Sequence, residues 1–320
     1  MLTWNKLIDN LYLVKEDSDR VNRLNSLIIQ GNEEYSSVLI DANYPFAEID
    51  ALYSKIKKAK MLIFSHGHLD HTAHAFYHQE KYGTTAYCPV QEREYLTDLD
   101  ALMELVGFNK LGLTQDYRKM IKYYIKFKEC EKVTTFDPGN ISFKTENFII
   151  KTIHIPGHSP GHTAFELSST KKKTQRKILY VSDIGSHPYY GDLNSNISQY
   201  RDSIDKLEHI YLNGDYILVP AHGNYYIKKD RTFFERIRNK ININKEKVLN
   251  SLNSHKAKSL RKLVDERIIT PPERVYEPIR ELYYLWDGGM INQHLIELIN
   301  EQKVKKIKKA DFLSHKYIKI

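Results

Sequence analysis

A short stretch of the sequence, Ser-His-Gly-His-Leu-Asp-His at residues 65–71, carries three histidines and an aspartate. Alternation along an extended chain places His66, His68 and Asp70 on the same side. Three imidazoles and a carboxylate converge in apolar surroundings only around a cation that neutralises and binds them. Nitrogen ligands combined with a hard oxygen ligand suit Zn, Fe or Mn better than Mg or Ca. This stretch therefore predicts a metal site.

An apolar run followed by a metal-competent side chain occurs four times in the sequence. Residues 61–64 are apolar and lead into the histidine-rich stretch, which predicts a buried strand with the polar residues in the loop at its end. The later examples are His158 within Pro-Gly-His-Ser-Pro-Gly-His, Asp183 after the run at 178–181, and His222 within Pro-Ala-His-Gly. Glycines beside the two histidines allow the backbone bends that bring a short side chain to an ion. These strand ends predict one site built from distant parts of the chain.

Strands and helices are predicted to alternate along residues 1–227, and this order favours layered α/β packing. Short apolar runs predict strands at 11–14, 26–29, 37–41, 61–64, 86–89, 141–143, 148–154, 163–167, 178–181 and 216–219. Apolar residues at helical spacing predict helices at 47–58, 72–81 and 197–211. The polar, basic run at 168–177 between two strands predicts a hairpin turn.

Residues 91–131 interrupt this rhythm of strands with two helical patterns. Apolar residues recur at helical spacing from Leu96 to Val106, and a second helix, rich in Lys and Tyr, is predicted from Tyr117 to Cys130. We expect this insertion either to cover the metal site as a lid or to pack on the flank of the catalytic domain, with the lid preferred.

Residues 228–320 are predicted to form a second, smaller domain that is mainly helical and basic. They carry 22 Lys and Arg against 12 Asp and Glu, a net charge of +10, whereas residues 1–227 carry a net charge of −2. A helix beginning near Val275 is expected to break at Gly288-Gly289 before a last amphipathic helix. Short strands at 304–307 and 312–318 follow, and helices followed by a two-stranded ribbon are a winged-helix-like order.

These motifs resemble those of the metallo-β-lactamase-fold hydrolase superfamily. The resemblance rests on the stretches at 65–71, 156–162 and 220–223 together with Asp183, and it extends over residues 8–227. It implies an αββα sandwich, an α/β fold with the site at one edge of two facing sheets. The motif at 156–162 is most similar to the glyoxalase-II branch, and the C-terminal region resembles that of the winged-helix-bearing endoribonuclease branch.

The resemblance also implies an enzyme with two divalent metal ions as cofactor, Zn in the first place and Fe or Mn as alternatives. The implied ligands of the first ion are His66, His68 and His158. The implied ligands of the second ion are Asp70, His71 and His222, with Asp183 bridging both. A water between two such ions becomes a bridging hydroxide near neutral pH and attacks the substrate. Asp70 and Asp183 are the catalytic residues of this scheme, because Asp70 orients the hydroxide and Asp183 holds both ions.

Other residues are expected to support the site without binding metal. Asp41 lies where the family usually has Asp-Thr-Gly, and here Asp-Ala-Asn stands in that place, so we expect it to act behind the ligands. His187 and Tyr225 follow strands that carry ligands and are candidates for the substrate pocket. Four further histidines are expected to have structural roles, namely His74, His78, His154 and His162.

Composition favours an ordinary cytoplasmic enzyme. The chain has 320 residues and two cysteines, Cys88 and Cys130, which form no CxxC pair, so thiolate metal sites are unsupported. No apolar run reaches the roughly 20 residues of a membrane span, and residues 1–9 show no signal-peptide pattern. We therefore expect reduced thiols and no membrane partner.

Two substrate classes fit these observations. One is a small molecule with an ester, thioester, lactone or lactam bond, which the glyoxalase-II-like motif favours. The other is single-stranded RNA, because the basic C-terminal region would attract a polyanion. That region could equally pair two subunits in a homodimer. A nucleic-acid-binding module without catalysis is disfavoured, because all seven ligand positions are filled.

Overall fold

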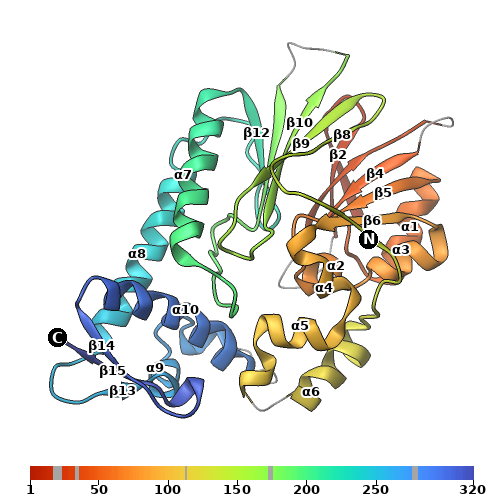
Figure 1. Ribbon diagram of the computed structural model, residues 1–320. Coiled ribbons are helices and arrows are strands. Elements are labelled where there is room, and N and C mark those ends of the chain that lie inside the picture. The colour runs from red at the N-terminus through yellow and green to blue at the C-terminus, as the bar shows by residue number, and fades with distance from the viewer. Residues whose placement is uncertain (17–23, 33–35, 112–113, 172–175, 276–279) are drawn as a thin grey trace.

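Two β-sheets face each other in the computed structural model, which describes residues 1–16, 24–32, 36–111, 114–171, 176–275 and 280–320 (Figure 1). Helices cover the outer side of each sheet, and a smaller helical region follows them in the chain. The layered α/β sandwich predicted from the sequence is confirmed, as is the helical C-terminal region.

The first sheet contains seven of the described strands in their sequence order. They are β1 Leu2–Ile8, β2 Leu11–Glu16, β3 Asn25–Ile29, β4 Ser37–Ile40, β5 Ala59–Ile63, β6 Thr85–Pro89 and β7 Val133–Phe136. Strands β1 to β4 pair antiparallel, whereas β4 to β7 run parallel, so the carboxyl ends of β4 and β5 reach the same edge. The sequence patterns missed β1 and β7, because both are edge strands with many exposed residues.

The second sheet contains five described strands in the order β12-β11-β10-β9-β8. They are β8 Ser142–Lys144, β9 Phe148–His154, β10 Thr163–Ser169, β11 Lys177–Ser182 and β12 Tyr216–Pro220. Because β10 is antiparallel to both β9 and β11, and β12 is parallel to β11, the carboxyl ends of β9, β11 and β12 share one edge. Four residues of the expected hairpin turn, 172–175, lie outside the described part of the chain.

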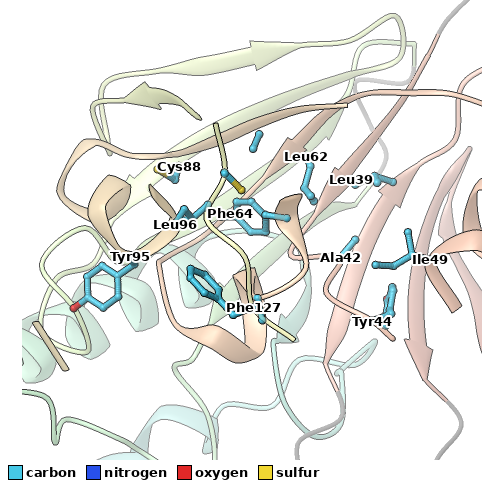
Figure 2. Close-up of a cluster of buried hydrophobic side chains, with 14 of the residues drawn as sticks. Leu39, Ala42, Tyr44, Ile49, Leu62, Phe64, Cys88, Tyr95, Leu96 and Phe127 are labelled. Carbon is cyan, nitrogen blue, oxygen red and sulfur yellow. The ribbon is translucent and has the colours of Figure 1, made fainter. Parts of the chain in front are cut away.

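Apolar clusters fill the spaces between these layers. One cluster packs the first sheet against its helices, and Figure 2 shows Leu39 and Leu62 of the sheet near Ile49 of the helical layer. A second cluster lies between the sheets and joins Ile40 to Phe165. A third packs the second sheet against two long helices. The helices concerned are α1 Phe46–Ile56, α2 Leu69–Thr72, α3 Ala75–Tyr82, α7 Ile197–Asn213 and α8 Phe233–Ser251.

The insertion at 91–131 is anchored on the outer side of the first sheet. Its helices are α4 Arg93–Thr97, α5 Leu99–Val106 and α6 Thr114–Lys119, followed by a π-helical segment at Met120–Ile125. The helix predicted to reach Cys130 ends earlier, because Lys126 adopts a left-handed conformation with φ 62°. Leu96 and Phe127 join the apolar cluster of the first sheet, as Figure 2 shows. A role for this insertion as a lid stays a prediction.

The C-terminal region contains helices and a small sheet. Its elements after α8 are β13 Lys258–Ser259, α9 Leu260–Asp265, α10 Leu282–Asn300, β14 Val304–Ile307 and β15 Lys316–Lys319. Among the described strands, β15 pairs with both β13 and β14, and a separate apolar cluster includes Val248, Leu263 and Leu295. Helix α8 lies within the predicted C-terminal domain, yet its Phe234 and Ile241 pack in the apolar cluster of the second sheet.

The expected helix break at Gly288-Gly289 is wrong, because α10 continues through both glycines. The reason is a close backbone contact. A Cβ placed on Gly289 would lie 1.7 Å from the carbonyl oxygen of Gly191, so this position needs the absence of a side chain. Residues 276–279, where the preceding helix was expected, lie outside the described part of the chain.

Candidate metal centre

All seven predicted ligand side chains lie together where strands of both sheets end. Their donor atoms form two groups, each with its members within 4.8 Å of one another. The first donor group contains His66, His68 and His158. The second donor group contains Asp70, His71, Asp183 and His222. They come from loops after β5, β9, β11 and β12 and from α2, so the edge shared by these strand ends creates the site.

The spacing of the donor atoms fits a metal ion in each group. Nε2 of His66 lies 3.1 Å from Nε2 of His158, and Nε2 of His222 lies 3.2 Å from Oδ2 of Asp70. Oδ1 of Asp183 lies 3.0 Å from Nε2 of His71. Ligands at about 2.1 Å from a tetrahedral ion lie about 3.4 Å from one another. The residues present therefore match the first coordination sphere of a metal such as zinc.

Asp183 lies between the two donor groups. Its Oδ2 is 3.6 Å from Nε2 of His158 in the first group and 3.7 Å from Nε2 of His222 in the second. Its other oxygen faces His71, as described above. One carboxylate thus reaches members of both groups, which is the geometry that a bridging ligand needs.

In His68 and His158, the imidazole nitrogen that faces away from the site has a polar partner. Nε2 of His68 lies 2.5 Å from Oδ2 of Asp192, and Nδ1 of His158 donates to the carbonyl oxygen of Tyr189 over 2.8 Å. Partners of this kind fix the ring and leave the opposite nitrogen for a metal ion, here Nδ1 of His68 and Nε2 of His158. Asp192 also accepts a 2.6 Å hydrogen bond from the hydroxyl of Tyr189.

Asp41 supports the site from behind through a buried network. Its Oδ2 lies 3.0 Å from Nδ1 of His71 and accepts hydrogen bonds from the hydroxyls of Ser65 and Tyr180 over 2.6 and 2.8 Å. Its Oδ1 accepts the backbone N–H of Ser65 over 2.8 Å. Oγ of Ser65 lies 3.0 Å from Nδ1 of His66. The carboxylate therefore contacts one ligand directly and a second one through Ser65.

Glu92 connects the loops that carry the first donor group, and sequence patterns did not identify it. Its carboxylate is buried and accepts the N–H of Gly67 over 3.0 Å, the hydroxyl of Ser159 over 2.7 Å and the N–H of Gly161 over 2.6 Å. Gly67 lies beside His66, whereas Ser159 and Gly161 follow His158 in another loop of the site. Burial is the main cause that raises the pKa of Glu92.

Glu92 and Asp192 carry no signal in the sequence that marks them as site residues. Glu92 lies among other charged residues at the start of the insertion, and Asp192 lies in a polar loop after Tyr189. Their partners are glycine N–H groups, a serine hydroxyl and a histidine from distant segments. Only the folded arrangement reveals these contacts.

The structure does not join the two pocket candidates to the donor groups. His187 is exposed, and its described hydrogen bond is with the neighbouring hydroxyl of Ser186, over 3.1 Å. Tyr225 is half-buried and packs against the cluster between the sheets. A role for either residue in substrate binding stays a prediction.

The other histidines make structural hydrogen bonds. The rings of His74 and His78 contact backbone carbonyl oxygens of Tyr44 and Ala42. Nε2 of His154 donates to the carbonyl oxygen of Pro160 over 2.8 Å. His162 is closer to the site, since its Nε2 accepts the backbone N–H of Asp183 over 3.3 Å.

Charge separation within the site favours a bound cation. Burial lowers the pKa of His158 to about 4, and repulsion from His68 adds to this. Burial also acts to lower the pKa of His68, but attraction to Asp192 outweighs it and raises this pKa to about 9. Burial acts to raise the pKa of Asp70, yet attraction to His71 and a hydrogen bond with His222 lower it to about 2. The carboxylate of Asp70 is therefore ionised at neutral pH and retains negative charge that a cation would neutralise.

Access to the site is from the side of the second donor group. The side chains of Asp70 and His222 are 36% and 31% exposed, whereas His66 and His158 are buried. A substrate or water from solvent therefore meets the second donor group first.

Comparisons with known proteins agree with this geometry. The sequence profile of the metallo-beta-lactamase superfamily matches residues 21–222. The chain is 25% identical over 199 residues to the hydroxyacylglutathione hydrolase GloC of Haemophilus influenzae, which covers 61% of this chain and 83% of that relative. It is 24% identical over 164 residues to an uncharacterized protein of Mycobacterium leprae, which covers 51% of this chain and 68% of that relative.

Two solved structures are similar over nearly the whole chain. A beta-lactamase domain protein from Burkholderia ambifaria has a TM-score of 0.72 at 15% identity and covers 99% of this chain and 93% of its own. A metallo-beta-lactamase family protein from Thermus thermophilus also has a TM-score of 0.72 at 15% identity, covering 97% of this chain and 99% of its own. At 15% identity, these similarities show a shared fold only. The shared fold extends into the C-terminal region of this chain. Across the described ranges, no helix combines the length and apolar character needed to cross a membrane.

Proposed function

The chain belongs to the metallo-beta-lactamase superfamily as a metal-dependent hydrolase, and we propose that it holds two divalent ions and cleaves an ester, thioester, lactone or lactam bond of a small molecule. The observation that carries this proposal is the pair of donor groups with Asp183 between them. The outward partners of His68, His71 and His158 support it, because they orient the rings before an ion arrives.

The proposed roles of the residues follow from their positions. His66, His68 and His158 would hold the first ion, Asp70, His71 and His222 would hold the second, and Asp183 would reach both. When bound, two such ions lower the pKa of a water molecule and polarise the bond to be cleaved. Asp70 is the more exposed carboxylate, so it is placed to orient the attacking water. Zinc suits these nitrogen and oxygen donors best, with Fe and Mn as alternatives.

The similarity to a hydroxyacylglutathione hydrolase makes an acylated thiol the first substrate to test. Purified protein loaded with zinc is assayed on a hydroxyacylglutathione, on a lactone and on labelled single-stranded RNA. We expect hydrolysis of at least one small molecule, and Asp183→Asn should abolish it, because the carboxylate of Asp183 lies near donors of both groups. Asp311→Asn is the matched control, since Asp311 is exposed and bonds Ser314 in the C-terminal region. Unchanged turnover in Asp183→Asn would refute the two-ion proposal.

Single-stranded RNA is the second candidate substrate, because β14 and the loop after it concentrate positive charge. Lys305, Lys308 and Lys309 are exposed there, next to a helix and strand order that we interpret as winged-helix-like. Contacts with phosphates release counterions and make binding sensitive to salt. Replacing the three lysines by glutamine should therefore weaken RNA cleavage and its salt dependence while leaving small-molecule hydrolysis unchanged. RNA cleavage that does not respond to these changes would exclude this region as the RNA-binding surface.

The same region could instead join two subunits, and sedimentation distinguishes these roles. A homodimer should give twice the mass of the chain at micromolar concentration, with or without RNA. A monomer that gains mass only with RNA supports the polyanion role. Both roles assume that the protein is cytoplasmic. They also assume that the predicted C-terminal domain begins at residue 228, directly after the catalytic domain at 1–227.

A further inference from the structure

The loop at 185–196 supplies partners to two proposed ligands, and the C-terminal helix α10 packs against it. This loop follows Asp183 and carries Tyr189 and Asp192, which contact His158 and His68. It also ties itself to the 156–162 stretch, because the hydroxyl of Ser195 donates to the carbonyl oxygen of His158 over 2.8 Å. The position of this loop therefore decides how two imidazoles of the first donor group are oriented.

Helix α10 meets the loop without an intervening side chain. A Cβ on Gly289 would lie 1.7 Å from the carbonyl oxygen of Gly191, and a Cβ on Gly191 would lie 2.6 Å from the carbonyl oxygen of Trp286. Real side chains never approach backbone atoms this closely, so both positions depend on glycine. The two backbones are thus in direct contact one residue before Asp192.

Two buried side chains of α10 hold the same loop by hydrogen bonds. The hydroxyl of Tyr190 lies 2.8 Å from Nε2 of His294, whose Nδ1 faces the carboxylate of Glu297 over 3.1 Å. Because that carboxylate accepts a hydrogen bond from Nδ1–H, Nε2 is the acceptor for the hydroxyl of Tyr190. Gln293 donates to the carbonyl oxygen of Ser195 over 2.7 Å and accepts the N–H of Ile197 over 3.3 Å.

We propose that α10 is a positioning element of the metal site, which fixes the 185–196 loop so that Asp192 and the carbonyl of Tyr189 hold His68 and His158 for the first ion. The proposal rests on the proposed two-ion function. It gives the C-terminal region a role in the site that does not require RNA or a second subunit. The contacts of α10 described above are made with the loop, so the helix acts on the donor groups through it.

A pair of neighbouring glycines on α10 provides the test and its control. Gly289→Ala places a methyl group on the backbone of Gly191 and should push the loop away from His68. Gly288→Ala makes the same change one residue earlier, where the added Cβ would meet Val264 at 3.5 Å and Leu313 at 3.9 Å, which are ordinary contacts. Both changes raise helix propensity equally. Any difference between the variants therefore reports the contact with the loop.

The measurement is the zinc affinity of the full-length protein, determined by competition with a chromophoric chelator. Loss of a partner behind a metal-bound histidine weakens binding by roughly 10–100-fold. We expect a loss in this range at one of two sites for Gly289→Ala and no loss for Gly288→Ala. Equal affinities in wild type and both variants would overturn the proposal. Failure of the wild type to bind zinc, iron or manganese would instead refute the proposed function itself.

A second variant keeps the test decisive if Gly289→Ala does not fold. Tyr190→Phe removes the hydroxyl that binds His294 and leaves the buried ring in place. Its effect on zinc affinity should disappear in an Asp192→Asn background, because the loop acts through Asp192. Additive losses in the double variant would mean that Tyr190 acts on general stability and would also contradict the proposal.

Coupling between α10 and the site must act in both directions. If the helix holds the loop for the ion, zinc must in turn stabilise the helix against opening. Hydrogen exchange of the amides in 289–298 should therefore slow when zinc is added. Exchange that is insensitive to zinc in a protein that binds two ions would contradict the proposal.

Discussion

Glu92 shows at the residue scale how the site is held together by groups that need not touch a metal. Its buried carboxylate accepts three hydrogen bonds, and these connect Gly67 to Ser159 and Gly161 across the first donor group. Both glycines are required, because a Cβ on Gly67 would lie 2.5 Å from Tyr95 and a Cβ on Gly161 would lie 2.6 Å from Glu92 itself. The carboxylate of Glu92 therefore connects the loop that carries His66 to the loop that carries His158.

Glu92→Gln should destabilise the protein and loosen the site. The amide nitrogen of glutamine is a donor, so one of the three donors facing Glu92 would lose its acceptor inside the protein. An unsatisfied buried group of this kind costs about 1–3 kcal/mol. The measurement is the free energy of unfolding in urea, together with zinc affinity.

Glu94→Gln is the control for this change, since Glu94 is exposed in α4, two residues after Glu92. We expect its unfolding free energy to match the wild type. A Glu92→Gln protein as stable as the Glu94→Gln control would contradict the role that we assign to this carboxylate.

The positions of the proposed ligands and of Asp41 behind them were accessible from sequence, whereas the supporting groups Glu92 and Asp192 were not. His66, His68 and Asp70 stand at fixed spacing after an apolar run, and each of the other loops also begins where a strand ends. The spacing of these residues along the chain is therefore enough to predict them as metal ligands. Glu92 and Asp192 obtain their roles from contacts across 25 to 124 positions of the chain, and no local pattern encodes such contacts.

Helix α10 shows at the element scale how charged side chains dock the C-terminal region. Its Glu297 accepts a 2.9 Å hydrogen bond from Arg201 of α7 and faces His294 and Lys245, the latter on α8 at 4.0 Å. Burial acts to raise the pKa of Glu297, but the hydrogen bonds from His294 and Arg201 outweigh it and lower this pKa. Three helices therefore meet at one ionised carboxylate.

The lowered pKa of Glu297 predicts a loss of stability in acid. A carboxyl group whose pKa is lower in the folded state stabilises the protein above its unfolded pKa of about 4.3. That contribution is lost as the pH falls through the folded pKa, because the unfolded state then binds the proton more readily. Glu297→Gln should remove this acid sensitivity and about 1–2 kcal/mol of stability at neutral pH.

Unfolding free energy measured between pH 3 and pH 7 tests this prediction. Glu273→Gln serves as the control, because Glu273 is exposed in a short 3₁₀ turn at Pro272–Arg274. Parallel pH curves for the wild type and Glu297→Gln would show that Glu297 does not contribute to docking.

The sequence predicted strands and helices correctly where their apolar runs are buried. The prediction failed for strands at the edges of sheets and for the helix at the close backbone contact of Gly289. Strands β1, β7 and β13 are short, or polar on the exposed side, so no apolar run marks them. Gly288-Gly289 was interpreted as a helix break from its low helix propensity. The contact of Gly289 with Gly191 shows that packing overrode that propensity.

The apolar clusters connect the two predicted domains at the scale of the whole molecule. Phe234 and Ile241 of α8 pack with the second sheet, and Leu282 and Leu285 of α10 pack with the cluster of the first sheet. Figure 1 shows α10 lying between the C-terminal strands and the insertion that carries α5. The C-terminal region therefore completes two cores of the catalytic part.

This shared packing predicts that the whole chain unfolds in one transition. Calorimetry should give a single peak whose calorimetric and van't Hoff enthalpies agree, as two-state unfolding requires. Two separated peaks would show that residues 228–320 unfold independently and would weaken any coupling between α10 and the site. A sequence pattern cannot predict this property, because it depends on faces that meet only after folding.

The central claim is that seven side chains from four strand ends and one short helix hold a pair of ions. Anomalous diffraction from zinc-soaked crystals at the zinc absorption edge tests it most directly. We predict two peaks, one within bonding distance of His66, His68 and His158, the other beside Asp70, His71 and His222, with Asp183 between them. Crystals with zinc bound elsewhere, or with no peak at these residues, would contradict the account.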